Sequence, residues 1–183
     1  MKRTVGSLVV ILLMAFILTG VMAQAEKAQY IGTDKCKMCH MSKSRGQQYP
    51  IWKESKHSKA YETLASEQSK AVAEKAGVSG DPQKAEECLV CHVTAYGEPK
   101  SKFAASFSME EGVGCETCHG PGSEYKSMKV MKDLAADKID PATVAFKAGD
   151  KETCLGCHNE KSPTFKGFNF EKDYAKIKHP TPE

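Results

Sequence analysis

The chain has 183 residues, with 26 Lys and Arg against 23 Asp and Glu, so its formal net charge is +3. This length suits one domain, and so mild a charge, dispersed along the chain, excludes a dedicated nucleic-acid binder. Eight cysteines and a single Trp indicate a domain too poor in large apolar side chains to close a conventional core, so it needs disulfides, a metal or a covalent cofactor.

Residues 1–25 are predicted to be a secretory signal peptide. Lys2-Arg3 precede an uncharged apolar stretch that ends in Ala23-Gln24-Ala25, the small-residue pattern that signal peptidase cleaves. Cleavage after one of these alanines leaves residues 26–183 as an exported, periplasmic domain. The alternative is an uncleaved signal that anchors the protein in the membrane, because the apolar stretch is nearly long enough to span a bilayer.

The exported domain is predicted to be mainly helical. Residues 50–77 predict a long helix that Pro50 opens and Gly77 stops. Asp81-Pro82 predicts a short helix that leads into the second pair of cysteines. Residues 99–114 have little periodicity and predict a loop with a short strand near 103–107. Further short helices are predicted to begin at Ser123 and run toward Leu134, to begin at Asp140-Pro141, and to cover residues 174–178.

The eight cysteines fall into four C-x-x-C-H motifs, with no cysteine left over. The cysteines are Cys36, Cys39, Cys88, Cys91, Cys115, Cys118, Cys154 and Cys157, and the histidines that follow them are His40, His92, His119 and His158. One such pair fits a redox site or half a zinc site, but four copies that each end in His indicate haem attachment. The two thiols form thioethers with haem vinyl groups, and the adjacent His becomes the proximal iron ligand. We therefore predict four covalently bound haems c.

Four haems in a domain of this size have to lie edge to edge or in stacked contact. The porphyrins then form the apolar interior that the side chains are too few to supply. Electrons are expected to pass rapidly between haems that lie so close together. The predicted fold class is therefore mainly α, with little regular sheet, organised by the haems.

Distal ligands for the irons are scarce. Only His57 and His179 remain after the four proximal histidines, so at most two haems can have two histidine ligands from this chain. Met128 and Met131 lie one turn apart on a predicted helix and serve either in packing or, one of them, as an axial ligand. At least one haem is then five-coordinate, and its iron either binds a small gaseous ligand or is shielded by side chains.

Longer segments around these motifs resemble the tetrahaem cytochromes of the cytochrome c-554 type. The similar segments are Tyr30-Ile31-Gly32, 52–60, Cys91-His92-Val93 with Tyr96-Gly97, 112–122 and, more weakly, 168–179. This resemblance implies a mainly helical fold with the haems in closely packed pairs. It also implies that His57 is the distal ligand of the third haem, that His179 is that of the fourth, and that the second haem is five-coordinate.

The chain departs from the family pattern at one ligand. The family has a histidine shortly after the Gly-Pro-Gly segment as the distal ligand of the first haem, and residues 123–131 contain none. Either a methionine takes its place, with Met128 the first choice and Met131 the alternative, or the first haem is also open.

The leading functional prediction is a periplasmic electron carrier between soluble or membrane-bound redox proteins. It follows from four closely packed haems and from the lack of an acid–base or nucleophile constellation. Members of the family serve in nitrogen-compound oxidation and other respirations. One alternative is an enzyme that reduces nitric oxide or a related nitrogen oxide at the five-coordinate haem. Another is a subunit of an extracellular cytochrome filament, which the shortage of histidines disfavours.

Overall fold

The computed structural model describes residues 27–181, and the predicted signal peptide lies outside the described residues. The described chain consists of short helices joined by loops, and the predicted mainly α fold class is confirmed. The α-helices are α2 (Asp34–His40), α3 (Gln48–Glu54), α4 (Ala60–Thr63), α5 (Glu67–Lys75), α6 (Glu86–His92), α7 (Cys115–His119), α8 (Met128–Ala135), α9 (Lys151–Leu155) and α10 (Phe170–Tyr174). Short 3-10 helices cover Lys43–Arg45, His57–Lys59, Lys100–Lys102, Met109–Glu111 and Pro141–Val144. Across residues 27–181 no helix is both long and apolar enough to cross a membrane.

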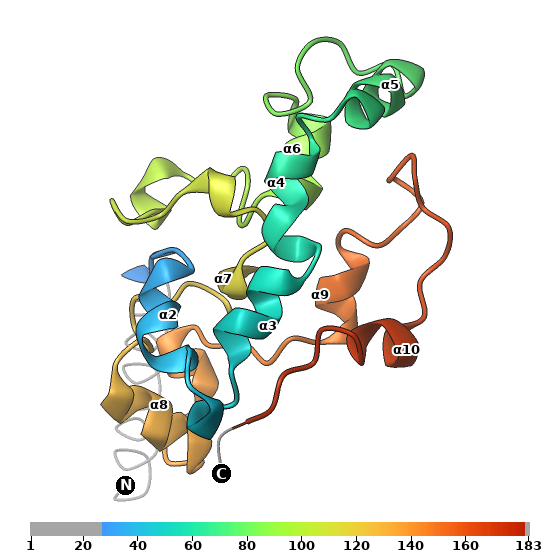
Figure 1. Ribbon diagram of the computed structural model, residues 1–183. Coiled ribbons are helices and arrows are strands. Elements are labelled where there is room, and N and C mark those ends of the chain that lie inside the picture. Colours follow the sequence, from blue (N-terminus) through green and yellow to red (C-terminus); the bar gives the residue numbers. More distant parts are fainter. Residues whose placement is uncertain (1–26, 182–183) are drawn as a thin grey trace, which may run out of the picture.

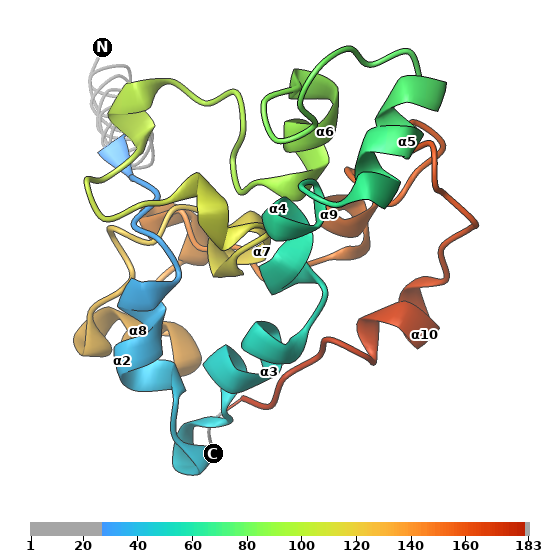
Figure 2. The same cartoon turned by 45° about the horizontal axis from the view of Figure 1, so that its top comes forward.

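The helices are arranged around a central column. In Figure 1, α3 and α4 form this column, with α2 and α8 toward one end of the molecule and α5 and α6 at the other. Helix α7 lies near the middle, while α9 and α10 flank the column, and the carboxyl-terminal segment returns to the foot of α3. The turned view in Figure 2 keeps α2 and α5 at opposite ends. The first and second C-x-x-C-H motifs, on α2 and α6, are therefore far apart.

The long helix predicted over 50–77 is wrong, because two serines interrupt it. Ser55 is extended, with φ −75° and ψ 162°, and ends α3. Ser66 is also extended and caps α5, where its hydroxyl accepts a hydrogen bond from the Ser69 N–H at 3.1 Å. The break at Ser55 sets His57 in a separate short 3-10 turn.

Serine and aspartate caps also decide where the later helices begin. Asp140 caps the 3-10 helix that starts at Pro141, as predicted. Helix α8 begins at Met128, later than predicted, because Ser127 is its cap. The Ser123 hydroxyl instead accepts a hydrogen bond from the Gln29 N–H at 2.9 Å. Its polar side chain therefore anchors the start of the described chain rather than a helix.

Three further predicted elements are shorter or displaced. Helix α6 begins at Glu86, and Asp81 only forms a turn by accepting a hydrogen bond from the Gln83 N–H. Among residues 27–181, the strand predicted near 103–107 is reduced to an isolated bridge between Tyr30 and Phe103. The helix predicted over 174–178 ends where it was expected to start, since α10 stops at Tyr174.

Apolar side chains alone make only a small core. Leu64, Leu89 and Val93 form one buried cluster, against which Tyr61 and Tyr96 pack. The other buried hydrophobic residues are Ala28, Ile31, Ala73 and Tyr125. So few buried side chains provide little hydrophobic stabilisation for a domain of this length, as expected when a cofactor completes the interior.

A buried carboxylate ties the start of the described chain to the third motif. Glu116 is 3% exposed and accepts hydrogen bonds from the N–H groups of Ile31 at 2.9 Å, Gly32 at 2.8 Å and Gly122 at 2.6 Å. Burial raises the pKa of this carboxyl above its ordinary value, while these N–H donors act in the opposite direction. Glu116 therefore holds together three backbone segments that surround the first and third motifs.

Replacing Tyr125 by phenylalanine is expected to lower the free energy of unfolding of the haem-loaded protein by about 1–2 kcal/mol. The Tyr125 side chain is buried and its hydroxyl donates a hydrogen bond of 2.7 Å to the Gly120 carbonyl, which phenylalanine would leave unpaired. Denaturant unfolding measures the change. Tyr174→Phe is the control, because among the described residues the hydroxyl of Tyr174 makes no hydrogen bond. An equal loss in both variants would contradict the prediction.

Candidate haem centres

Each C-x-x-C-H motif lies on a helical turn. The motifs occupy α2, α6, α7 and α9. In the fourth motif α9 ends at Leu155, but the N–H of His158 still donates to the Cys154 carbonyl at 2.9 Å, which continues the turn. Residues three apart on a helix share a face, so both cysteines of a motif point to the same side. All eight cysteines are free and half-buried, as two thioether bonds to one porphyrin require.

The first motif contacts the third. The Cys36 thiol is in hydrogen-bond contact with the Cys115 thiol, and this contact, followed by burial, raises the pKa of Cys36. Gly114 shows how close the two segments lie, since a Cβ added there would come within 2.5 Å of the Thr33 hydroxyl oxygen. Any larger residue at 114 would push the two motifs apart.

The second motif contacts the fourth, and the thiols of the fourth and third motifs are close enough to interact electrostatically. Burial, followed by the neighbouring Cys91 thiol, raises the pKa of Cys157. Burial, followed by Cys154, raises the pKa of Cys118 to about 11. The motifs therefore follow the spatial order first, third, fourth, second, with the first and second at the two ends.

Three of the four proximal histidines have the hydrogen bond expected of an iron ligand. Nδ1 of His92 lies 2.7 Å from the Ala60 carbonyl oxygen, and Nδ1 of His119 lies 2.9 Å from that of Lys147. Nδ1 of His40 lies 3.0 Å from the side-chain oxygen of Gln48. Donation from Nδ1 fixes the tautomer and leaves Nε2 with a free lone pair for a metal.

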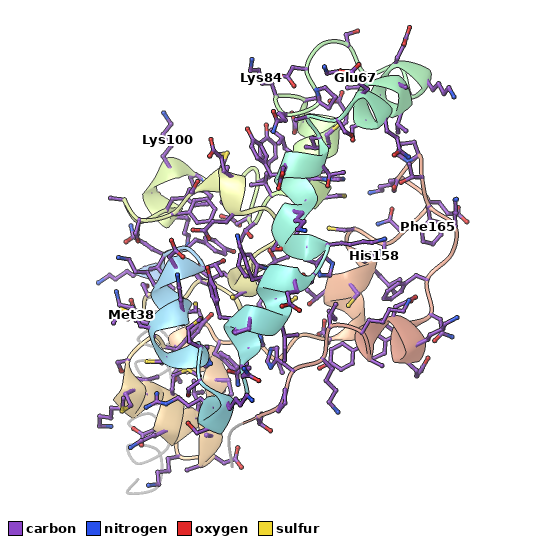
Figure 3. All side chains as sticks on the ribbon, viewed as in Figure 1. Met38, Glu67, Lys84, Lys100, His158 and Phe165 are labelled. Carbon is purple, nitrogen blue, oxygen red and sulfur yellow. The ribbon has the colours of Figure 1, made fainter. Side chains whose placement is uncertain are left out.

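Aromatic rings orient the third and fourth proximal histidines. The His119 ring stacks on Phe146, with centroids 5.5 Å apart and planes 8° from parallel. The His158 ring stacks on Phe168 at 4.9 Å and 15°, and in Figure 3 this histidine points toward the central column. Stacking limits the rotation of each imidazole, which keeps the iron-binding nitrogen in a defined direction.

The two remaining histidines face proximal ones. The ring centroids of His57 and His158 are 6.0 Å apart, and those of His179 and His119 are 5.8 Å apart. A metal–imidazole nitrogen bond is about 2 Å long, and the ring centroid lies about 1 Å behind that nitrogen, so two histidines on opposite sides of one iron have centroids roughly 6 Å apart. Both pairs fit this arrangement.

The electrostatics of the two histidines also favour metal binding. Burial, followed by the neighbouring His158, lowers the pKa of His57. Burial, followed by His119, lowers the pKa of His179. Lowered pKa values keep both imidazoles neutral, which is the form that binds a metal. One ring nitrogen of His179, Nδ1, is buried without a hydrogen bond, so it lacks the partner that Nδ1 has in His40, His92 and His119.

The ring contacts in the structure differ from the ligand pairing that the family resemblance implies, and the pairing of ligands stays a prediction. His57 lies beside the fourth motif rather than the third, and His179 lies beside the third rather than the fourth. The separate turn that holds His57 and the return of the carboxyl-terminal segment to α3 account for the exchange (Figure 1).

The first and second motifs have no such histidine partner within residues 27–181. Within the described residues the ring contacts of His57 and His179 are with His158 and His119. His179 also lies close enough to His40 for that histidine to lower its pKa, after burial and His119. Met128, at the start of α8, is 49% exposed, and Met131 is half-buried one turn later. No hydrogen bond or ring contact among the described residues connects either methionine with a histidine of a motif, so ligation of an iron by Met128 or Met131 stays a prediction.

Side chains outside the motifs hold the carboxyl-terminal segment in place. Besides accepting from His40, Gln48 donates from its Nε2 to the Pro180 carbonyl at 2.9 Å. Gly46 has φ +89° and approaches the same carbonyl so closely that a Cβ there would lie 2.4 Å from it. These contacts fix the position of Pro180, and the preceding residue, His179, then lies next to the third motif.

Sequence reasoning missed Gln48, Phe146 and Phe168. No sequence pattern identifies them, because each contacts a histidine of a motif from outside that motif. Glutamine is also common in polar loops and phenylalanine in apolar patches, so the residue types alone indicate no function. The acceptors at Ala60 and Lys147 are backbone carbonyls, which every residue has, so the sequence cannot identify them.

Comparison with known proteins identifies similar sequences. The family described as "Cytochrome c554 and c-prime" matches residues 35–120. The curated protein cytochrome c-554 of Nitrosomonas europaea is 32% identical over 165 residues, which cover 83% of this chain and 67% of the relative. No solved structure matches.

Proposed function

Because this protein belongs to the cytochrome c554 family, it is a c-type cytochrome that carries electrons on covalently bound haem, and we propose that it holds four haems c. These haems form a single row along which electrons are transferred. Each haem is attached to the two cysteines of one motif, and the histidine of that motif is its proximal ligand. Haem supplies a one-electron iron couple, which the protein tunes through ligands, hydrogen bonds and burial.

The observation that carries the proposal is the row of contacts between motifs. The thiols of the first and third motifs are in contact, as are those of the fourth and second, and the thiols of the third and fourth motifs are close enough to interact electrostatically. With one haem bonded to the thiols of each motif, neighbouring haems would lie close together. An electron that enters at either end therefore reaches the other without leaving the protein.

In this proposal His57 is the distal ligand on the haem of the fourth motif and His179 on that of the third. The ring separations of 6.0 Å and 5.8 Å support these two assignments. Met128, with Met131 as the alternative, is the proposed sixth ligand on the first haem. The second haem is proposed to be five-coordinate.

The domain is proposed to act in the periplasm after removal of residues 1–25, between redox proteins that are themselves soluble or membrane-bound. An uncleaved signal would keep the same domain at the membrane surface. Amino-terminal sequencing of the exported protein distinguishes the two forms.

The test is a haem count combined with a redox titration. Mass spectrometry of the exported protein is expected to give the mass of the chain plus four haems, and spectroelectrochemical titration is expected to take up four electrons. Fewer than four haems, or a haem that cannot be reduced without a small ligand, would overturn the proposal.

A second candidate function is binding and reduction of nitric oxide or a related nitrogen oxide at the second haem. It rests on the described contacts of His92, which include a backbone carbonyl but no histidine on the opposite side. The ferrous protein is then expected to bind about one equivalent of carbon monoxide. Failure to bind either carbon monoxide or nitric oxide would rule this function out.

Replacing Gln48 by leucine is expected to raise the reduction potential of the first haem. The variant removes the acceptor for His40 Nδ1–H, so the imidazole becomes a poorer electron donor to the iron and the ferric state loses stabilisation. It also frees the Pro180 carbonyl from its hydrogen bond. Gln48→Glu separates the two roles, because it keeps an acceptor for His40 but cannot donate to Pro180 when ionised.

Potentiometry with magnetic circular dichroism measures both effects of these variants. Gln48→Leu should raise one potential, and Gln48→Glu should lower the same one. An unchanged set of potentials in both variants would contradict the role assigned to Gln48.

A further inference from the structure

We propose that the outward face of α2 and its immediate continuation is the docking surface for a redox protein with an acidic surface. This inference rests on the proposed four-haem chain, because it assigns a partner to one end of that chain. The face is called the α2 face and consists of Lys35, Lys37, Met38, Met41 and Lys43.

The α2 face points away from the haem-binding side of the helix. At 3.6 residues per turn, Cys36, Cys39 and His40 project to one side of α2, and Met38 projects to the other. Met41 retains helical dihedral angles after the end of α2, so it continues the same outward stripe. The haem attached to this motif therefore cannot cover Met38.

Two methionines on this face are exposed. Met38 is 85% exposed and Met41 is 45% exposed, and Figure 3 shows Met38 at the outer edge of the molecule. Methionine is enriched at the centres of protein interfaces, where its flexible side chain fits different partners. An exposed apolar centre with a charged rim is the usual anatomy of a docking site.

The rim of the α2 face is basic. Lys35, Lys37 and Lys43 are exposed around the methionines, and the Lys37 ammonium is held 5.5 Å from the centre of the Tyr49 ring. Of the acidic residues nearby, Asp34 accepts a hydrogen bond from the Tyr49 hydroxyl at 3.3 Å. Glu111 accepts one from the Thr33 N–H, and Glu110 lines the same hollow. The α2 face itself carries three lysines and no carboxylate, so it is positively charged, with the acidic residues at its border.

Charge along the chain also directs an acidic partner to this end. Residues 27–60, which contain the first motif, carry eight Lys and Arg against two Asp and Glu. Residues 61–98, which contain the second motif, carry three Lys against seven Asp and Glu. In Figure 2, α2 of the first segment and α5 of the second lie at opposite ends of the molecule, so an acidic surface is attracted to one end and repelled from the other.

Contact at Met38 also gives a short path for the electron. Met38 is covalently adjacent to Cys39, whose sulfur carries the first haem in the proposed chain. One electron passes from a ferrous haem, which becomes ferric, to the oxidised metal of the partner, with no proton or bond exchanged. Because the first haem is an end of the chain, the remaining haems can refill it.

The experiment follows oxidation of the fully reduced four-haem protein by an acidic plastocyanin in a stopped-flow instrument. For the wild type, the second-order rate constant is expected to fall about tenfold or more between low and high ionic strength. The triple variant Lys35→Gln, Lys37→Gln, Lys43→Gln should be about tenfold slower at low ionic strength and nearly independent of salt.

A matched variant separates local from overall charge. This control variant carries three substitutions at exposed positions outside the α2 face, Lys100→Gln, Lys161→Gln and Lys166→Gln. It removes the same charge as the α2-face variant and should react like the wild type. An equal loss of rate in both triple variants, or no loss in either, would overturn the proposal. Met38→Gln should slow the reaction at every ionic strength, whereas Leu155→Gln, at the 39% exposed leucine of the fourth motif, should not.

Two further measurements distinguish docking of a protein from binding to a membrane and from failure of the proposed electron carrier. The first measurement is sedimentation with phosphatidylserine vesicles. If the wild type sediments with the vesicles and the triple lysine variant of the α2 face does not, while both react equally with plastocyanin, the partner is a membrane surface and the proposal is overturned. Ferricyanide tests the carrier function separately. A reduced protein that cannot reduce ferricyanide would refute the proposed chain itself, whereas normal reduction with an unaffected α2-face variant would refute docking alone.

Discussion

Replacing Glu116 by alanine is expected to lower the free energy of unfolding by about 4 kcal/mol, the largest effect expected of any single residue that binds no haem. The carboxylate accepts from three backbone N–H groups, those of Ile31, Gly32 and Gly122. Alanine would leave all three donors buried without a partner, at a cost of about 1–3 kcal/mol each where water cannot enter. The segment before the first motif would then separate from the third motif.

Denaturant unfolding of the haem-loaded protein, followed in the Soret band, measures this loss. Glu116→Gln keeps the shape of the side chain but turns an N–H₂ group toward N–H donors, so it should lose about half as much. Glu152→Ala is the control, because Glu152 is exposed and sits in the first turn of α9 outside this cluster. A stability of Glu116→Ala within about 0.5 kcal/mol of the control would show that the three N–H groups find other partners.

Removing either His57 or His179 is expected to convert one low-spin haem to the high-spin state. Each ring stands across from a proximal histidine, His158 or His119, and no other histidine of the described chain is placed to replace it. In each alanine variant the ferric high-spin resonance should grow by one haem equivalent, and carbon monoxide binding to the reduced form should increase by one equivalent.

Substitution of the same positions by methionine tests the role in coordination. His57→Met should retain a six-coordinate, low-spin haem but raise its potential, because thioether ligation favours the reduced iron. An alanine variant with unchanged resonance and unchanged ligand binding would exclude that histidine as a ligand. NMR contacts between the His57 ring and the methyl groups of each haem decide the pairing, which we expect to be with the haem on Cys154 and Cys157.

The parts of this structure that depend on local sequence could be predicted. The four motifs form helical turns, Asp140 caps the helix that begins at Pro141, and the fold is mainly helical. Each of these follows from residues within a few positions of one another. The family was also recognisable, because the segments around the third motif and from Trp52 to His57 are long enough to be specific.

The parts that depend on contacts between distant segments could not be predicted. The periodicity of residues 50–77 favours one helix, but the Ser66 hydroxyl offers the Ser69 N–H a local partner and a new helix starts there. The position of His179 beside His119, which differs from the pairing that the family resemblance implies, depends on the path of the carboxyl-terminal segment. That path is set by Gln48 and Gly46, whose contacts with Pro180 span most of the chain.

The thiol contacts between motifs have a consequence for assembly. Before haem is attached, a chain folded in this way would hold Cys36 against Cys115 and Cys157 against Cys91. In an oxidising compartment, thiol–disulfide exchange with an oxidised protein disulfide would join two such thiols in a disulfide, the protein disulfide taking up the two electrons and two protons, and the sulfurs needed for thioether bonds would be consumed. Premature folding would thus cross-link the wrong partners, so the chain has to remain open and reduced until each haem is in place.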